Sequence, residues 1–213
     1  MNKSDFLQAL SEIRIKGTKS CLVHVSLIDL GLFQGIKISK INDFIFKSLK
    51  KYTSKNCTIS TLTPFYEYAD KKKEFDIKKS LPSKEIGDFS RFIFSKRNSY
   101  RSHNPLFNIS SIGPLAKKIT QKHSASAFGK NSSWESLYNY NSDMIFIGCD
   151  LSRCTFIRYI EHKFGVPYLI NKTFNTKIKS NGKILHLKSS STLRNLKINV
   201  KYKTEKFENI LKK

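Results

Sequence analysis

The 213-residue sequence has no apolar run of the roughly 18–20 residues that a transmembrane helix requires, so it predicts no membrane span. The first 20 residues also lack an uninterrupted apolar segment, because Asp5, Glu12 and Arg14 lie among their apolar positions. This stretch does not resemble a signal peptide. A cytoplasmic location is therefore expected.

Cysteine is scarce as well. The four cysteines are Cys21, Cys57, Cys149 and Cys154, and they include no CxxC pair and no histidine at the spacing of a metal site. Free cysteines of intracellular proteins are commonly buried and reduced, and we expect that state here. The sequence predicts no metal site.

Acidic residues are few. Asp and Glu number 16 against 39 Lys and Arg, which gives a formal net charge of +23. A positive field of this size attracts nucleic acid or anionic small molecules. The lysines are spread along the chain, however, and no RNP motif, zinc-finger spacing or glycine-rich basic arm is present. Nucleic acid is therefore an unlikely partner, and phosphate-bearing small molecules are the expected ones.

What the chain does contain is typical of a globular protein. Hydrophobic residues make up 39% of it and aromatic residues 12%. Its length is enough for one well-buried core and short for two domains. We therefore expect a single domain over residues 1–213.

Apolar spacing predicts alternating helices and strands. The expected helices are Phe6–Ile15, Ile41–Leu49, Ile86–Phe94, a segment after Pro114, a segment capped by Ser152 or Thr155 that ends near Lys163, and Phe207–Leu211. The expected strands are Cys21–Ser26, Thr58–Leu62, Phe107–Ile112, Met144–Gly148 and a hairpin that turns at Asn181-Gly182. The charged, irregular stretch Glu67–Ser83 is expected to be a surface loop. This alternation indicates a layered α/β domain.

The most informative stretch runs from Arg101 to Glu161. It contains Arg101-Ser102-His103-Asn104-Pro105, then Ile112-Gly113, His123, Phe128-Gly129, Ile147-Gly148 and Cys154-Thr155-Phe156-Ile157-Arg158-Tyr159-Ile160-Glu161. This order resembles the aminoglycoside 3-N-acetyltransferase family, whose members move an acetyl group from acetyl-CoA to an amine on a sugar ring. The similarity runs from about Leu22 to Tyr168 and looks closest to the branch that acts on nucleotide-linked amino sugars. It implies an α/β/α fold with a central mixed sheet.

The resemblance implies an acetyl-CoA site built from several segments. His24-Val25-Ser26-Leu27 is similar to the family's strand-to-loop element beside the pantetheine arm, and Arg101-Ser102 to an element in which the serine binds that arm and the arginine a phosphate or carboxylate. A packed strand end and an ordinary ion pair are the alternative interpretations of these two elements. The residues implied to contact the cofactor are His24, Ser26, Leu27, Gly31, Arg101, Ser102 and Thr155.

Thr155, Arg158 and Glu161 match the family's Thr-x-x-His-x-x-Glu, in which the histidine is the general base and the glutamate orients it. A sugar ammonium must lose a proton before its nitrogen can attack a thioester, and a base with a near-neutral pKa takes that proton. Arg158 occupies the place of the histidine, and a guanidinium stays protonated at any working pH.

Three interpretations of this replacement remain open. The protein is weakly active or inactive, with Arg158 paired to Glu161; or His162, one turn on and about 40° round the helix from Arg158, replaces the base; or His103 or His123 takes the proton. His123 matches a histidine that the family places near the acceptor, and a helix-terminal histidine is the alternative reading of it. His103 lies one residue before the family's histidine position, which Asn104 holds.

The leading hypothesis is an acetyl-CoA-dependent N-acetyltransferase that acts on an amino sugar, either nucleotide-linked or aminoglycoside-like. An inactive relative that binds CoA or a sugar nucleotide is the alternative, and a basic nucleic-acid-binding module is a third. Family members usually continue past the point that matches Leu211, so the chain is expected to be shortened at its C-terminus. Such an end either leaves an acceptor-side surface open or needs a second subunit, which makes a homo-oligomer one expected assembly.

Overall fold

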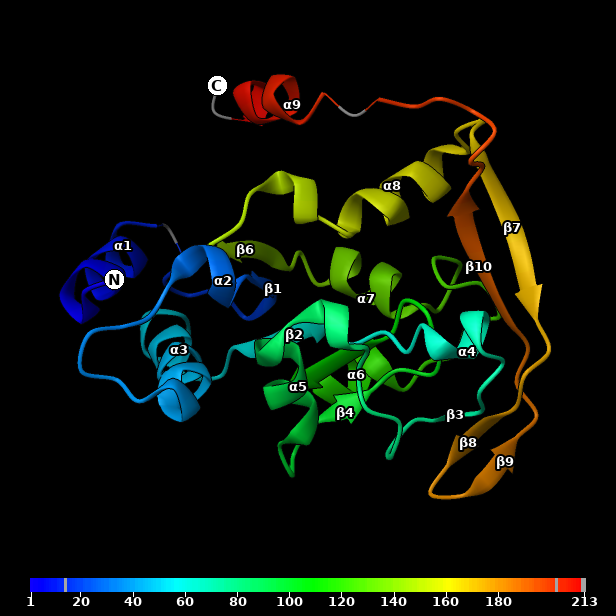
Figure 1. Cartoon of the computed structure of the whole chain (residues 1–213), viewed down its shortest axis with the longest axis horizontal. Coiled ribbons are helices and arrows are strands. Elements are labelled where there is room, and N and C mark those ends of the chain that lie inside the picture. The colour runs from blue at the N-terminus through cyan, green and yellow to red at the C-terminus, as the bar shows by residue number, and fades with distance from the viewer. Residues whose placement is uncertain (14, 202, 212–213) are drawn as a thin grey trace.

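A five-stranded mixed sheet lies at the centre of the computed structural model, which describes residues 1–13, 15–201 and 203–211 (Figure 1). The strand order is β4-β5-β2-β1-β6. These strands are β1 (Ser20–Val25), β2 (Thr58–Leu62), β4 (Tyr100–Arg101), β5 (Ile109–Ile112) and β6 (Asp143–Ile147). β1 is parallel to both β2 and β6, whereas β5 is antiparallel to β2 and β4. The predicted mixed sheet is confirmed.

One face of the sheet is covered by α1 (Lys3–Glu12), α3 (Ile38–Tyr52) and α5 (Asp88–Ser95). In α3, Ile41, Ile45 and Leu49 recur at helical spacing and are all buried. They pack with Val23 of β1 and Ile59 of β2 in one apolar cluster. The period of the apolar residues therefore produces both the helix and its contact with the sheet.

The opposite face is covered by α6 (Ala116–Thr120), α7 (Ser133–Asn139) and α8 (Phe156–Phe164), which run across the sheet in Figure 1. Their buried residues Ile119, Trp134 and Tyr159 pack with Leu22 of β1 and Ile109 of β5. Leu22 and Val23 are neighbours in one strand, so they point to opposite faces and enter different clusters. The result is the predicted α/β/α layering.

Two smaller β structures lie beside these layers. A long antiparallel ribbon pairs β7 (Leu169–Phe174) with β10 (Ser189–Arg194), and a small sheet joins β3 (Phe75–Asp76), β8 (Ile178–Ser180) and β9 (Lys183–Leu185). The turn between β8 and β9 lies at Asn181 and Gly182, whose φ angles are 51° and 81°. Both values are positive, as a tight hairpin turn requires, so the predicted turn is confirmed.

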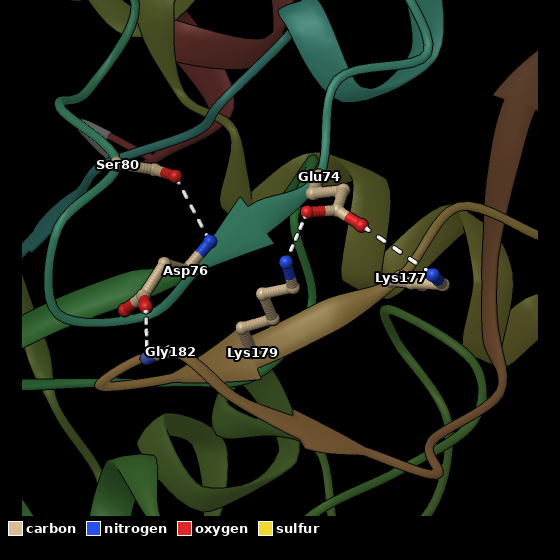
Figure 2. A network of polar contacts seen from close by, with 6 residues as sticks. All are labelled: Glu74, Asp76, Ser80, Lys177, Lys179 and Gly182. Atoms are coloured by element: carbon tan, nitrogen blue, oxygen red, sulfur yellow. Dashed lines mark hydrogen bonds and ion pairs between the residues drawn. The ribbon is translucent and has the colours of Figure 1, made fainter.

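Charged side chains attach this hairpin to β3, as Figure 2 shows. The Glu74 carboxylate pairs with Lys179 and, at 3.8 Å, with Lys177. The Asp76 carboxylate accepts a hydrogen bond of 2.8 Å from the backbone N–H of Gly182. Residues about a hundred positions apart in the sequence are thus joined at one edge of the molecule.

The expectation of a surface loop over Glu67–Ser83 is wrong. This stretch forms α4 (Glu67–Asp70) and β3, and it buries Tyr68, Phe75 and Ile77 in an apolar cluster with Ile178 of β8. The lysine run 71–73 made the segment look solvated. The apolar side chains pack against a strand far along the chain, and local sequence carries no signal of that partner.

The remaining elements are short or peripheral. They are α2 (Leu27–Leu30), the 3₁₀ turns η1 (Lys84–Ile86) and η2 (Leu151–Arg153), and α9 (Thr204–Leu211). The helix predicted over Phe6–Ile15 is α1, which ends at Glu12; position 14 lies outside the described residues. Across the part of the chain that the structure describes, no helix is long and apolar enough to cross a membrane.

Candidate functional site

The carboxyl end of β1 lies at a switch point of the sheet. β1 pairs with β2 on one side and with β6 on the other, while α3 leads to β2 over one face and α7 leads to β6 over the other. In open α/β sheets such a point is the usual ligand crevice. His24, Ser26, Leu27 and Gly31 are at or just after this strand end, where the sequence predicted cofactor contacts.

The turn after β1 is held closely against the end of β6. The N–H of Ser26 donates to the carbonyl of Ile147 at 2.9 Å. Gly148 has a φ of +66°, and a Cβ there would lie 2.5 Å from the carbonyl oxygen of Ser26. Only glycine fits so close an approach. The Ser26 hydroxyl donates to the Asp29 carboxylate and makes no capping hydrogen bond to the first N–H groups of α2.

His24 is held neutral at this strand end. Its ring stacks on Phe146 of β6, with ring centroids 5.1 Å apart and planes at 6°. Burial lowers the pKa of His24 to about 4, so the imidazole is uncharged near pH 7. Its Nε2 is buried and has no hydrogen-bond partner among the described residues. An unsatisfied buried nitrogen at a ligand crevice is one that a ligand could pair.

Arg101 lies in the core, which corrects the expectation that it holds a phosphate or carboxylate. Its side chain is 5% exposed and its guanidinium lies between the rings of Phe75 and Phe94, 4.7 Å from each centroid. The Nε donates to Asn108 Oδ1 at 2.7 Å, and the two terminal nitrogens donate to the carbonyls of Ser80 and Thr63. Each guanidinium nitrogen of Arg101 is therefore bonded within the protein, to two backbone carbonyls and to one side chain.

Ser102 and Asn104 also support the local fold. The Ser102 hydroxyl accepts a hydrogen bond of 2.9 Å from the N–H of Ile109. The Asn104 side chain accepts from the N–H of Phe107 at 3.0 Å and donates to the carbonyl of Ser190 at 3.2 Å. Asn104 thereby connects the central layers to β10. Ser102 keeps its hydroxyl proton for a further partner.

The structure brings His103 and His123 together. Their ring centroids are 5.7 Å apart and nearly perpendicular, beside a polar cavity of about 10 Å³. The buried atoms His103 Nδ1, Ser126 Oγ and Ser133 Oγ have no partner within the described ranges and come from residues that line this cavity. Burial lowers the pKa of both histidines, and the neighbouring His123 lowers that of His103 further. A cavity of this volume holds about one water molecule.

Arg158 and Glu161 form an ion pair on α8. The Arg158 Nη1 lies 3.0 Å from Glu161 Oε2, and the Tyr168 hydroxyl donates to Glu161 Oε1 at 2.8 Å. Glu161 is 6% exposed, so its carboxylate is buried with a partner on each oxygen. Thr155 occupies the N-cap position of α8, but its side chain makes no capping hydrogen bond, contrary to one sequence prediction.

His162 has partners that sequence reasoning missed. Its Nδ1 lies 2.8 Å from Thr192 Oγ1 on β10, and Thr192 Oγ1 donates to Asn171 Oδ1 on β7 at 2.8 Å. The His162 ring also lies 6.2 Å from the ring of Phe128. Thr192 and Asn171 lie in the polar β7–β10 ribbon. The alternating sequence pattern of this ribbon does not indicate that α8 contacts it. Burial lowers the pKa of His162.

The predicted residues thus fall into three places. His24 and Ser26 lie at the β1 end, His103 and His123 line the small cavity, and Arg158, Glu161 and His162 lie on α8. In the part of the chain that the structure describes, no group of three or more His, Cys, Asp or Glu side chains could hold a metal ion. The Sγ atoms of Cys21 in β1 and Cys57, directly before β2, lie 3.8 Å apart.

Comparison with known proteins places this fold. Solved structures similar to it include the acetyltransferase AAC-IIIb in binary complex with CoASH (15% identity, 100% of this chain and 83% of that chain, TM-score 0.77) and the aminoglycoside acetyltransferase AAC(3)-Xa (13% identity, 100% and 80%, TM-score 0.77). The YokD protein from Bacillus subtilis is similar as well (19% identity, 97% and 83%, TM-score 0.71). At these identities the likeness establishes a common fold.

Sequence comparison adds the family. No curated protein matches the chain in a sequence search. The model of the aminoglycoside 3-N-acetyltransferase family, however, matches residues 22–213, which cover every segment of the site described above. The chain therefore belongs to the aminoglycoside 3-N-acetyltransferase family.

Proposed function

We propose that the protein transfers the acetyl group of acetyl-CoA to the amine of an amino sugar. The observation that carries this proposal is the family match over residues 22–213, on a fold shared with a CoASH-bound acetyltransferase. In this reaction the neutral amine attacks the thioester carbonyl, the C–N bond forms and the C–S bond breaks. CoA leaves as the thiolate, and the proton that the attacking nitrogen loses as it becomes an amide passes to a base.

The residues after β1 suit the acyl donor. The pantetheine arm carries amides and methylene groups, so its site needs hydrogen-bonding groups beside apolar side chains. The uncapped N–H groups of α2 and the unpaired His24 Nε2 offer the first, and Ile28, which is 94% exposed, offers the second. Acetyl-CoA supplies the activated acyl group. These protein groups would hold its arm and polarise the thioester oxygen.

An acceptor that carries negative charge is favoured over an aminoglycoside. A groove of about 590 Å³ beside β7 is lined by Lys72, Lys172 and Lys177, and the carboxylate of Glu74 there is already paired with lysines. The whole chain carries +23. Such a field repels a polycationic aminoglycoside and attracts the diphosphate of a nucleotide-linked amino sugar. We therefore propose a nucleotide-linked amino sugar as the acceptor.

The test is release of CoA thiol from acetyl-CoA with a panel of nucleotide-linked amino sugars and aminoglycosides. We expect release with the nucleotide-linked sugars, at a rate that falls as salt screens the positive field. Thiol release with aminoglycosides alone would refute the proposed acceptor. No release with any acceptor would refute the enzymatic function.

A second candidate is a relative that binds CoA and does not turn it over. The Arg158–Glu161 pair favours this alternative, because Arg158 stands in the place of the family's base and engages the carboxylate that would orient it. Calorimetric binding of CoA without thiol release would support it. Thiol release by Arg158→His, with none by the native protein, would show an intact site that lacks its base.

A further inference from the structure

The hydroxyl of Thr192 is the central atom of a three-residue chain. Thr192 and Asn171 lie directly opposite each other in the β10–β7 register, so their side chains share one face of the ribbon. His162 reaches this face from α8. Three elements therefore converge on a single hydroxyl group.

Counting protons fixes the tautomer of His162. A threonine hydroxyl carries one proton, and here that proton is donated to Asn171 Oδ1 at 2.8 Å. The Thr192 oxygen can then only accept from His162 Nδ1, also at 2.8 Å, so Nδ1 carries a hydrogen. In a neutral imidazole the other nitrogen, Nε2, is left with its lone pair. The ribbon thereby sets Nε2 as a proton acceptor.

The surroundings of the ring keep it uncharged. Among the described residues, Thr192 bonds to the imidazole and the Phe128 ring lies beside it, with Asn171 behind Thr192, and none of these three side chains titrates near neutral pH. On its own helix, the charged residues are Arg158 and Glu161, which are paired with each other, and Lys163, whose Nζ lies over the ring of Tyr138 at 3.9 Å from the centroid. Burial of the ring favours the neutral form.

We propose that His162 is the general base of the acetyl transfer and that Thr192, supported by Asn171, is its positioning residue. This inference rests on the proposed function. The acceptor ammonium first loses one proton to solvent, and its neutral nitrogen forms the C–N bond as the C–S bond breaks. Nε2 takes the second proton that this nitrogen must lose to become an amide, and the imidazolium gives that proton to the leaving CoA thiolate. The Nδ1 hydrogen stays bonded to Thr192 throughout.

The other candidates fit this role less well. Arg158 is always protonated. His103 and His123 line a cavity of about 10 Å³, a volume that holds about one water molecule. His162 lies one helical turn beyond Arg158, so the same side of α8 still carries an ionisable nitrogen.

The experiment compares four variants with native protein in the thiol-release assay: His162→Gln, Thr192→Val, Thr192→Ser and His186→Gln. His186 is an exposed histidine in the loop before β10 and provides the matched control. We expect His162→Gln to lower kcat by about 10²–10⁴ with unchanged CoA binding. Thr192→Val should lower kcat about tenfold or more and alter the acid limb of its pH profile, Thr192→Ser should restore most of the loss, and His186→Gln should leave kcat unchanged.

A ¹⁵N spectrum of the histidine rings checks the tautomer without any turnover. We expect a protonated Nδ1 for His162 in native protein and in Thr192→Ser, and a mixture of tautomers in Thr192→Val. If native protein is active and kcat of His162→Gln stays within threefold of the native value, the base assignment is wrong and the proposed function stands. If native protein releases no thiol with any acceptor, both the proposed function and the base assignment are wrong. If the spectrum shows a protonated Nε2, the role of Thr192 as positioning residue is wrong.

Discussion

Two polar networks lie about one turn apart on α8 and differ in what they leave free. In the first, Glu161 accepts from Arg158 and Tyr168, one on each carboxylate oxygen. In the second, Thr192 bonds to Asn171 and to the Nδ1 of His162, and Nε2 is left for another partner. In the first network both carboxylate oxygens have partners within the protein. The second network leaves the lone pair of His162 Nε2 available to accept a proton.

This difference shows that remote partners decide the role of a residue. Arg158 and His162 lie on the same side of the same helix, so helical position does not separate them. Tyr168 and Arg158 close one network from near positions in sequence, whereas β7 and β10 supply the other. The Nε2 of His162 therefore becomes a proton acceptor because the β7–β10 ribbon contacts α8. The predictions below test whether the two networks are separate in this way.

The largest effect on kcat is expected from removing the histidine at position 162 and placing one at position 158. His162→Gln should lose about 10²–10⁴ in kcat, and the double variant Arg158→His/His162→Gln should recover at least tenfold of that loss. The reason is that a histidine at position 158 could be oriented by Glu161. Thiol release by the single and double variants, measured side by side, gives the answer. A double variant as inactive as His162→Gln would mean that the two positions are not equivalent.

The next effect concerns stability. Glu161→Gln should lower the free energy of unfolding by about 1–3 kcal/mol, because it weakens two hydrogen bonds of a buried carboxylate. It should leave kcat within threefold of the native value if the networks are separate. Urea unfolding and the thiol-release assay on the same preparation measure both quantities. A large loss of kcat without loss of stability would tie Glu161 to the base.

Acidification should destabilise the folded protein through His24. Its folded pKa is lowered from 6.5 to about 4, so below pH 6.5 the unfolded state binds the proton more readily. The stability that this histidine contributes is complete above pH 6.5 and is lost as the pH falls towards 4. Urea midpoints of native protein and His24→Phe between these pH values check this. Equal slopes for both proteins would mean that His24 does not carry the effect.

The smallest effect is expected for Arg158→Lys. A lysine keeps the charge beside Glu161 and loses the planar guanidinium, on a partly exposed side chain. We expect a loss of less than about 1 kcal/mol in unfolding free energy and no change in the acid limb of kcat. Thermal unfolding and a pH–rate profile measure these. A shifted acid limb would show that Arg158 influences the proton acceptor directly.

Local signals predicted much of the fold. The strand Thr58–Leu62 was predicted with the bounds it has, because its apolar and β-branched residues stop at Pro64. The turn at Asn181-Gly182 was predicted because few other residue pairs tolerate two positive φ angles. The buried stretch around Phe75 was missed, since its partner Ile178 lies about a hundred residues away. Local sequence patterns do not indicate contacts between residues that are so far apart in the chain.

The site shows the same limit. His103 and His123 lie side by side, and their role as site residues stays a prediction, whereas Arg101 was predicted at a ligand and is buried between two aromatic rings. An arginine beside a serine does not reveal whether its fork faces a phosphate or backbone carbonyls. Thr192 and Asn171 were missed because they are ordinary hairpin residues until the ribbon meets α8.

The attachment of Ser190 has a mechanical consequence. Its N–H donates to the carbonyl of Ala125 at 2.7 Å, and its carbonyl accepts from Ala127 and Asn104, so both peptide groups that flank its Cα are fixed to the body of the protein. Thr192 lies two residues on, about 7 Å along the strand at 3.4 Å per residue. A strand position close to a residue that is fixed on both sides moves less than a distant one. The Thr192 hydroxyl that orients the imidazole is therefore held close to a fixed point of β10.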